Sequence, residues 1–264
     1  MWNDIYEEVI VVKNQGIKNE YLFIKKLNNK KLNELSFLLQ ELVLFLFPYI
    51  KKESIIKCYK HIDYEKADIV IQVGNIKRYV SIKMGHKNSV HCESIEKFKK
   101  FLRSLDVRQE VIDEILKYQY GDGTLNGTGK VRMSATEYKQ NNQASIEFIN
   151  KELNKPDIIT KVINRFIIQG TQWHSRQINL LIYGTPEDFF FITPQEIYSY
   201  ILSKIDSQSS AIHFSCLTLQ PMSRVLDYNE KMEYMRHWIQ VKWYNLEDNI
   251  IELMNLKTQK LLNN

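Results

Sequence analysis

Three side chains between residues 68 and 83 have types and a spacing that could support chemistry. They are Asp68, Ser81 and Lys83. Together they would offer a negative charge, a hydroxyl and a positive charge, which are the means of acid–base and electrostatic catalysis. That chemistry requires all three side chains to lie on one surface, within hydrogen-bonding range of each other.

A β-hairpin would place these three side chains on one surface. Ala67–Val73 and Ile76–Met84 both alternate and are rich in β-branched residues, and Gly74–Asn75 between them is a two-residue hairpin signal. Counting back from that turn sets Asp68 directly opposite Ser81, and the lysine two residues further on shares their face. A four-residue loop would keep this register, whereas an odd-length loop or a bulge would break it.

An acid on one strand and S-x-K on the next resemble the active site of the PD-(D/E)xK nuclease superfamily. The resemblance covers about residues 14–104 at the level of motifs. It implies that Asp68 and a second carboxylate hold Mg²⁺ and that Lys83 acts on the attacking water or on the scissile phosphate. Two positions depart from the pattern: Ala67 replaces a proline that makes no metal contact, and Ser81 replaces the second acid.

The replacement acid is expected on the element that follows the hairpin. Some restriction enzymes of this superfamily have serine at the same point and supply the acid from the next helix, where Glu93 is the matching candidate and Glu96 its substitute. Asn88 or Ser89 can cap such a helix. Its apolar positions are Ile95, Phe98, Leu102 and Leu105. Glu93 would occupy the first turn, away from the apolar stripe.

A further acid interrupts the apolar seam of a helix expected from Gly16 to Leu27. Glu20 takes the position that completes the seam of Ile17, Ile24 and Leu27. A carboxylate facing a core costs several kcal/mol unless it is paired or binds a metal. In the superfamily an acid on the preceding helix often joins the metal site, and Glu20 matches that role. A structural salt bridge to a lysine or arginine is the alternative.

Composition indicates a globular protein. The chain has 264 residues, 44% hydrophobic and 12% aromatic, which is enough for a full core. Its three cysteines are widely spaced and suggest neither a disulfide framework nor a zinc site, and free thiols fit the cytoplasm. The N-terminus lacks the pattern of a signal peptide, and the most apolar run, Leu35–Phe47, is too short to span a membrane.

The net charge of +5 is concentrated in the half that carries the motif. Residues 1–104 hold 19 Lys and Arg against 12 Asp and Glu, which suits a polyanionic partner, although any single lysine run is more simply a solvated surface. Side chains in loops could contact phosphates or bases. These candidates are Lys87, Lys130, Arg132, Trp173, Arg176, Arg224 and Arg236. The Gly-rich run 121–130 that contains one of them lacks residues that a phosphate-binding loop needs, so we expect a mobile loop.

The expected fold is α/β (α+β), a restriction-endonuclease-like mixed central sheet flanked by helices, with additional C-terminal strands and helices. Residues 1–130 would form the nuclease core with the active-site hairpin. Residues 131–264 would add a helical insertion and strands that pack on the same sheet, giving one compact unit. Strands are expected at Asn179–Tyr183, Phe189–Thr193, Ala211–Leu219 and His237–Trp243.

The expected function is that of a Mg²⁺-dependent endonuclease acting on DNA, with Mn²⁺ as a substitute cation. Restriction or phage defence is the biological role that such an activity suggests. RNA as substrate and a homodimer remain open. The alternative is a binding module of the same fold with a decayed site, which Ser81 favours. A D-x(n)-S-x-K string also arises by chance in lysine-rich chains, where it is ordinary strand surface.

Overall fold

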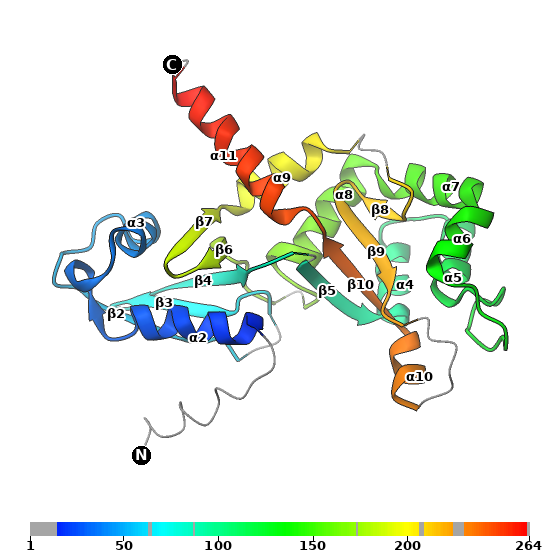
Figure 1. Cartoon of the computed structure of the whole chain (residues 1–264), viewed down its shortest axis with the longest axis horizontal. Coiled ribbons are helices and arrows are strands. Elements are labelled where there is room, and N and C mark those ends of the chain that lie inside the picture. Colours follow the sequence, from blue (N-terminus) through cyan, green and yellow to red (C-terminus); the bar gives the residue numbers. More distant parts are fainter. Residues whose placement is uncertain are drawn as a thin grey trace. The chain divides into compact units, whose positions relative to one another are not determined.

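The structure is a computed structural model that describes residues 15–62, 65–86, 88–172, 174–205, 209–223 and 230–262. The chain forms two compact units, each assembled from separate stretches of sequence (Figure 1). The first contains the described residues of Met1–His86, Ile168–Ile197 and Glu247–Asn264, and the second those of Lys87–Ile167 and Tyr198–Leu246. This division differs from the expected boundary at residue 130, because the chain leaves the first unit and returns to it twice.

The first unit is built on a six-stranded mixed sheet with the order β1-β2-β3-β4-β6-β7. Neighbouring strands are antiparallel except β4 and β6, which are parallel. The strands are β1 (Lys30–Lys31), β2 (Ile55–Lys60), β3 (Ile69–Val73), β4 (Ile76–Lys83), β6 (Leu180–Thr185) and β7 (Asp188–Ile192). The helices before them are α2 (Gln15–Leu27), a 3-10 turn (Leu32–Glu34) and α3 (Phe37–Leu46).

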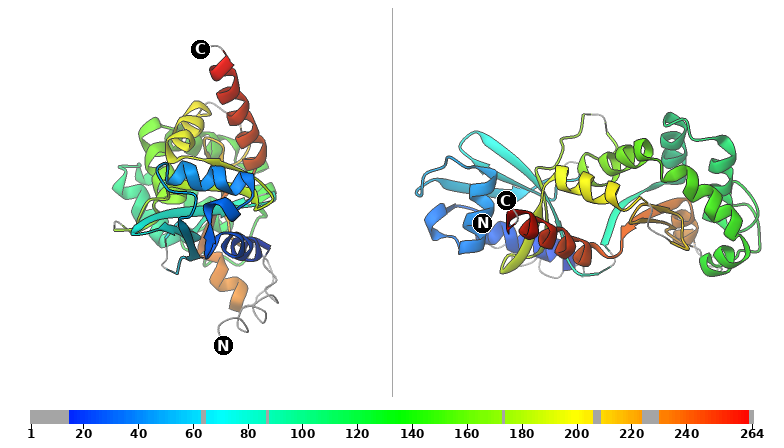
Figure 2. Two further views of the ribbon diagram at one scale, coloured as in Figure 1. Left: turned by 90° about the vertical axis from the view of Figure 1, so that its left-hand side faces the viewer. Right: turned by 90° about the horizontal axis from the view of Figure 1, so that it is seen from above.

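The core of this unit lies between α2, α3 and one face of the sheet. Strand side chains alternate between two faces, so every second residue points to these helices. The core residues of β2, β3, β4 and β6 are Ile56, Cys58, Ile69, Ile71, Val80, Ile82, Leu180 and Ile182. Seen from above, both helices lie on the same side of the strands (Figure 2). A slip of one residue in any strand would expose its whole apolar set, so this core holds the register of the hairpin.

The second unit has a sheet of its own with the order β5-β10-β9-β8, all antiparallel. Its strands are β5 (Asn88–Ser94), β8 (His213–Phe214), β9 (Leu217–Pro221) and β10 (Trp238–Trp243). Its helices are α4 (Ile95–Ser104), α5 (Gln109–Tyr120), α6 (Ala135–Asn141), α7 (Gln143–Leu153), α8 (Pro156–Ile163), a π-helical turn (Asn164–Ile168) and α10 (Glu230–Arg236). Two further helices, α9 (Pro194–Ser203) and α11 (Leu246–Leu262), contain points where the chain passes between units.

Two expectations about this region are wrong. The strands after residue 211 do not extend the hairpin's sheet but form a separate sheet, in which β10 pairs with β5 and with β9. The segment from Asn88 to Ser94 is a strand rather than the start of a helix, and Ser94 is the residue that caps α4 by accepting a hydrogen bond from the Lys97 amide. Both errors have one cause, because β5 is stabilised by pairing with β10, which lies far away in the sequence.

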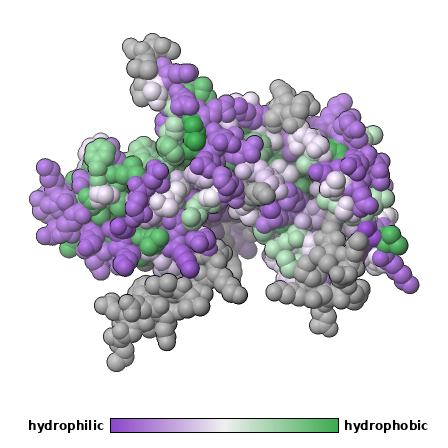
Figure 3. Space-filling model, viewed as in Figure 1, coloured by the Kyte–Doolittle hydropathy of each residue, from purple (hydrophilic) through white to green (hydrophobic). Residues whose placement is uncertain are grey.

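Hydrophilic residues cover most of the surface seen in Figure 3. Exposed apolar side chains in the first unit include Phe37 and Phe45 of α3. Among the helices that the structure describes, none combines the length and the apolarity needed to cross a bilayer.

Candidate active site

The hairpin brings Asp68, Ser81 and Lys83 together as its register predicts. Ser81 Oγ donates to Asp68 Oδ2 at 3.0 Å, and the backbone amide of Ile82 donates to the same oxygen at 2.6 Å. Lys83 Nζ lies 3.5 Å from that oxygen, and both side chains remain about one-fifth exposed, at 21% and 22%. All three contacts end on Oδ2, so they hold the carboxylate in place without using Oδ1.

The turn explains why this register forms. Val73 pairs with Ile76 and Gln72 with Lys77, so the loop has the two expected residues. Gly74 has a φ of +57°, in the left-handed region that glycine occupies at little cost. The Asp68 amide donates to the Val80 carbonyl, which extends the ladder by one step beyond β3.

Glu20 of α2 supplies a second carboxylate. It is 8% exposed, and its Oε2 accepts a hydrogen bond from Lys60 Nζ. Burial and the negative charge of Asp68 raise the pKa of Glu20, while the ammonium groups of Lys60 and Lys83 oppose the rise. Glu20 therefore forms the salt bridge to a lysine that the sequence left open as the alternative. Its carboxylate also interacts electrostatically with that of Asp68.

Lys60 is a site residue that the sequence reading missed. It lies at the end of β2, on the same face as Ile56 and Cys58, and so points to the side of the sheet that α2 covers. The sequence pattern could have predicted this position. Ile56, Cys58 and Lys60 alternate along the strand, which places the lysine on the face covered by the helix whose apolar seam Glu20 interrupts.

The donor set fits Mg²⁺ better than a metal that needs a closed protein cage. Mg²⁺ is bound through one or two carboxylates and keeps several waters. Asp68 and Glu20 are two hard oxygen donors, and Asp68 has a carboxylate oxygen that the hairpin contacts leave unused. Across the described ranges, no three His, Cys, Asp or Glu side chains gather as a metal-binding group. Two carboxylates, completed by water and substrate, are what this site can offer.

Glu93 is placed elsewhere, in β5 of the second unit. Arg165 donates to both of its carboxylate oxygens, at 3.2 and 2.6 Å, and His91 Nε2 lies 3.2 Å from Oε1. Burial alone would raise the pKa of Glu93, but the hydrogen bonds from His91 and Arg165 outweigh it and hold the pKa below its usual value. Its substitute, Glu96, is exposed and pairs with Lys99 at 2.6 Å. The structure gives Glu93 a structural ion pair within the second unit, whereas Asp68 belongs to the first unit.

The candidate contact residues divide into three groups. Lys87, Trp173 and Arg224 lie outside the described residues. Arg176 is half exposed on the first unit, where its Nη1 donates to the Tyr79 hydroxyl at 2.8 Å and its guanidinium lies over the Tyr79 ring.

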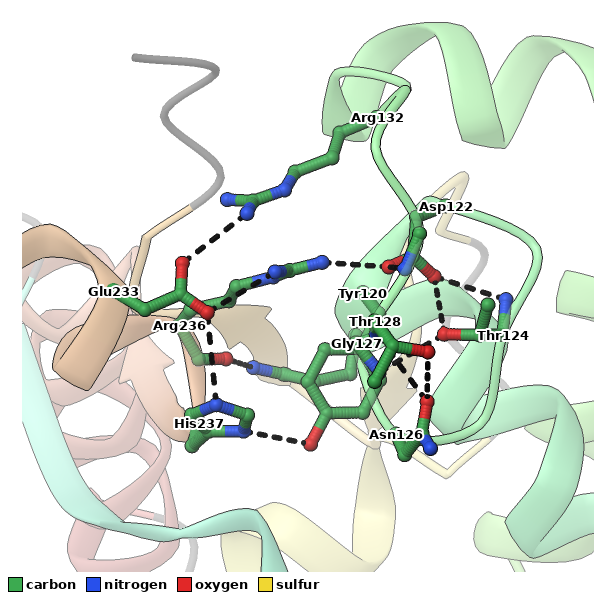
Figure 4. A network of polar contacts seen from close by, with 12 residues as sticks. Tyr120, Asp122, Thr124, Asn126, Gly127, Thr128, Arg132, Glu233, Arg236 and His237 are labelled. Carbon is green, nitrogen blue, oxygen red and sulfur yellow. Dashed lines mark hydrogen bonds and ion pairs between the residues drawn. The ribbon is translucent and has the colours of Figure 1, made fainter. Parts of the chain in front are cut away.

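The remaining three belong to the Gly-rich loop and its surroundings (Figure 4). Lys130 is exposed. Arg132 pairs with Glu233 at 3.1 Å, and Arg236, 3% exposed, pairs with Glu233 at 3.2 Å and with Asp122 at 2.6 Å. Arg132 and Arg236 are thus ion-paired inside the second unit.

The loop itself is closed by hydrogen bonds. Asp122 accepts from the amides of Thr124 and Gly129, both at 2.9 Å (Figure 4). Asn126 accepts from the amide and the hydroxyl of Thr128. The expectation of a mobile loop took no account of these turns, whose Asp and Asn side chains were visible in the sequence.

Comparison with known proteins gives a likeness in structure but none in sequence. No family model matches the chain, and no curated protein does. A solved structure that is similar is the crystal structure of the restriction endonuclease MspI in complex with its cognate DNA, with a TM-score of 0.55 and 12% sequence identity. The match covers 91% of this chain and 96% of that one. The chain therefore has the restriction-endonuclease-like fold, with a mixed sheet flanked by helices.

Proposed function

We propose that the protein is a Mg²⁺-dependent endonuclease that hydrolyses phosphodiester bonds in DNA. The observation that carries the proposal is the arrangement of Asp68, Ser81 and Lys83 on one hairpin face. Glu20 of α2 adds a carboxylate that interacts electrostatically with Asp68 and Lys83. Further support comes from the fold, which is similar to that of a restriction endonuclease solved with DNA. A role in restriction or phage defence would fit such an activity.

Asp68 and Glu20 would hold the cation. When bound there, Mg²⁺ supplies Lewis-acid polarisation of the phosphate and lowers the pKa of water. Ser81 and the Ile82 amide fix the Asp68 carboxylate, so that its geometry is set before substrate arrives. Lys83, 3.5 Å from Asp68, places a positive charge where the attacking water and the phosphate meet, and stabilises the charge that develops in the transition state.

Lys60 compensates the charge of Glu20. Because its ammonium bonds directly to Glu20, it competes with a divalent ion for that carboxylate. Ser81 remains neutral at any accessible pH, so it orients Asp68 but does not replace the charge of the missing acid.

A second candidate, a binding module that holds nucleic acid without cutting it, is favoured by the same two features. Ser81 lacks the carboxylate of the family pattern, and Lys60 occupies Glu20. Incubating supercoiled plasmid with the protein separates the two functions. The nuclease nicks plasmid in Mg²⁺ or Mn²⁺ and not in EDTA, whereas the binding module retards DNA at low salt and leaves it intact in every buffer.

A further inference from the structure

The sheet of the first unit has a second face, opposite α2 and α3, on which basic and aromatic side chains lie in rows. The register sets Lys57, Gln72 and Lys77 side by side across β2, β3 and β4. The next row holds Tyr59 and Tyr79 on either side of the buried Val70. The row after that contains Asp68 and Ser81, so this face leads to the hairpin residues of the candidate active site, while Glu20 belongs to α2 on the other face.

The row furthest from the site carries positive charge that no acid among the described residues balances. Lys57 and Lys77 are both exposed, and neither ammonium forms an ion pair with a carboxylate of the described residues. The residue between them, Gln72, is neutral. Its side chain is held in the surface, because its Nε2 donates to the Gly74 carbonyl at 2.7 Å and its Oε1 accepts from the Tyr59 hydroxyl at 3.3 Å.

Arg176 adds a third cation beside the middle row. Its guanidinium lies over the Tyr79 ring at 5.0 Å and is 51% exposed. The acid near it, Glu65, is only 7% exposed and also contacts His61 Nε2 at 2.9 Å. The outward charge of this part of the face is therefore positive.

We propose that this surface, formed by Lys57, Tyr59, Gln72, Lys77 and Arg176 and here termed the flank strip, binds the sugar–phosphate backbone of DNA beside the scissile bond. The proposal rests on the proposed function, since it assumes that the phosphate to be cut lies at Asp68 and Lys83. A polyanion is the partner that exposed ammonium groups such as those of Lys57 and Lys77 attract. The polar groups of Tyr59 and Gln72 are of the kind that bind phosphate and sugar without reading sequence.

Spacing relates the flank strip to a definite part of the substrate. Four strand residues separate the row of Ser81 from that of Lys77, a distance of roughly 13 Å at about 3.3 Å per residue. DNA rises about 3.4 Å per base pair along each strand, so the lysines would reach phosphates about four base pairs from the cut. Contact there would strengthen binding without taking part in the chemical step.

The test is the salt dependence of duplex binding, measured in EDTA so that the DNA stays intact. The double variant Lys57→Gln with Lys77→Gln is compared with Lys51→Gln with Lys52→Gln. All four lysines are exposed residues of the first unit, and each variant removes the same charge. Each lost phosphate contact lowers the slope of log affinity against log salt by about 0.9, so the flank-strip variant should lose about two units of slope and the control none.

Three results would overturn the proposal in distinguishable ways. If wild-type protein nicks plasmid but the flank-strip variant keeps the wild-type slope, the flank strip is not a DNA contact and the nuclease assignment stands. An equal loss of slope in the control variant would show a general effect of net charge. If wild-type protein neither binds nor cuts DNA, the proposed function falls and the flank strip falls with it.

Discussion

At the scale of single residues, the site is a balance of two carboxylates and two ammonium groups in partly buried surroundings. Asp68 is held by its own hairpin, and Glu20 is held by Lys60. Burying a carboxylate without a partner costs several kcal/mol, so such a group is kept only where a cation of some kind compensates it. Lys60 does this for Glu20.

The first prediction concerns cation binding. Asp68→Asn and Glu20→Gln should each weaken Mn²⁺ affinity in calorimetry, because a neutral amide gives up the charge that a hard cation selects. The loss should exceed the roughly 10-fold that even an outer-shell substitution typically causes. Glu96→Gln, at an exposed acid of the second unit, serves as control and should bind Mn²⁺ as wild type does. Unchanged affinity in Asp68→Asn would make Asp68 an ordinary strand-surface residue.

The second prediction concerns Glu93, to which the structure gives a stabilising role. Glu93→Gln should lower the free energy of unfolding by about 3 kcal/mol at neutral pH, since it leaves Arg165 and His91 with an amide in a buried position. The measurement is urea unfolding of wild type and variant. Mn²⁺ affinity should not change, and a large loss of affinity would return Glu93 to the metal site.

The same residue predicts a pH dependence. The folded-state pKa of Glu93 lies below its ordinary value of 4.5. The ionised carboxylate therefore makes its full contribution to the free energy of unfolding above pH 4.5, and this contribution is lost as the pH falls through the folded-state pKa. The stability difference between wild type and Glu93→Gln should therefore shrink in acid. A difference that grew on acidification would contradict the ion pair.

The positions of site residues could be predicted from the sequence where their contacts are local. Asp68, Ser81 and Lys83 could be brought together by counting from one turn, because a two-residue loop leaves a single register. Lys60 could have been found by the same alternation. That Glu93 lies in a strand and not in a helix could not be predicted, because the partners that fix it, Arg165 and strand β10, are remote in sequence.

At the scale of elements, the position of Glu20 depends on how α2 is attached to the sheet. Asn19, the residue before it, donates to the Gly184 carbonyl at 2.7 Å, and Gly184 lies at the end of β6, the strand that pairs with the strand of Lys83. The φ of Gly184 is +126°, and an added Cβ would lie 2.3 Å from the Asp188 carbonyl. The glycine therefore shapes both the β6–β7 turn and the anchor of α2.

The third prediction tests that anchor. Gly184→Ala should reduce the melting temperature and weaken Mn²⁺ binding together, because relieving the clash must move the carbonyl that holds α2. Gly74→Ala is the matched control, since Gly74 also has a positive φ but an added Cβ there meets nothing within 4 Å. If both variants lose melting temperature and Mn²⁺ affinity to the same extent, the cause is the strained backbone conformation at a positive φ, which costs about 1–3 kcal/mol, and not the anchor of α2.

The hairpin and the parallel strand β6 were predictable as elements, whereas the second sheet was not. Alternation predicted strands at Ala211–Leu219 and His237–Trp243. The second corresponds to β10, whereas the first is divided by a turn into β8 and β9. Alternation also carries no information about which edge a strand pairs with. The pairing of β10 with β5 and of β9 with β10 follows from where their apolar faces find a core, which is a tertiary property.

At the scale of the whole molecule, each of the two units has its own sheet. The candidate active site and the flank strip belong to the first unit, while the Asp122–Arg236 pair and its loop belong to the second. Sequence alone did not show this division, because both units are assembled from discontinuous stretches.

The fourth prediction follows from that division. Asp122→Asn removes the charge that faces Arg236 at a side chain with 0% exposure, so the second unit should lose stability. In hydrogen exchange, amides of β9 and β10 should lose protection while those of β3 and β4 keep it, and Mn²⁺ affinity should stay at the wild-type value. A uniform loss of protection would mean that the chain unfolds only as one cooperative body.

The central claim is that Lys83 acts in metal-dependent cleavage of DNA, and its most direct test is the rate of plasmid cleavage by Lys83→Ala in Mg²⁺. Removing one group that stabilises transition-state charge costs about 100- to 1,000-fold in rate, so the variant should cut at least about 100-fold more slowly. Lys52→Ala, at an exposed lysine of the same unit, should cut at the wild-type rate. Cleavage by Lys83→Ala at the wild-type rate would contradict the account.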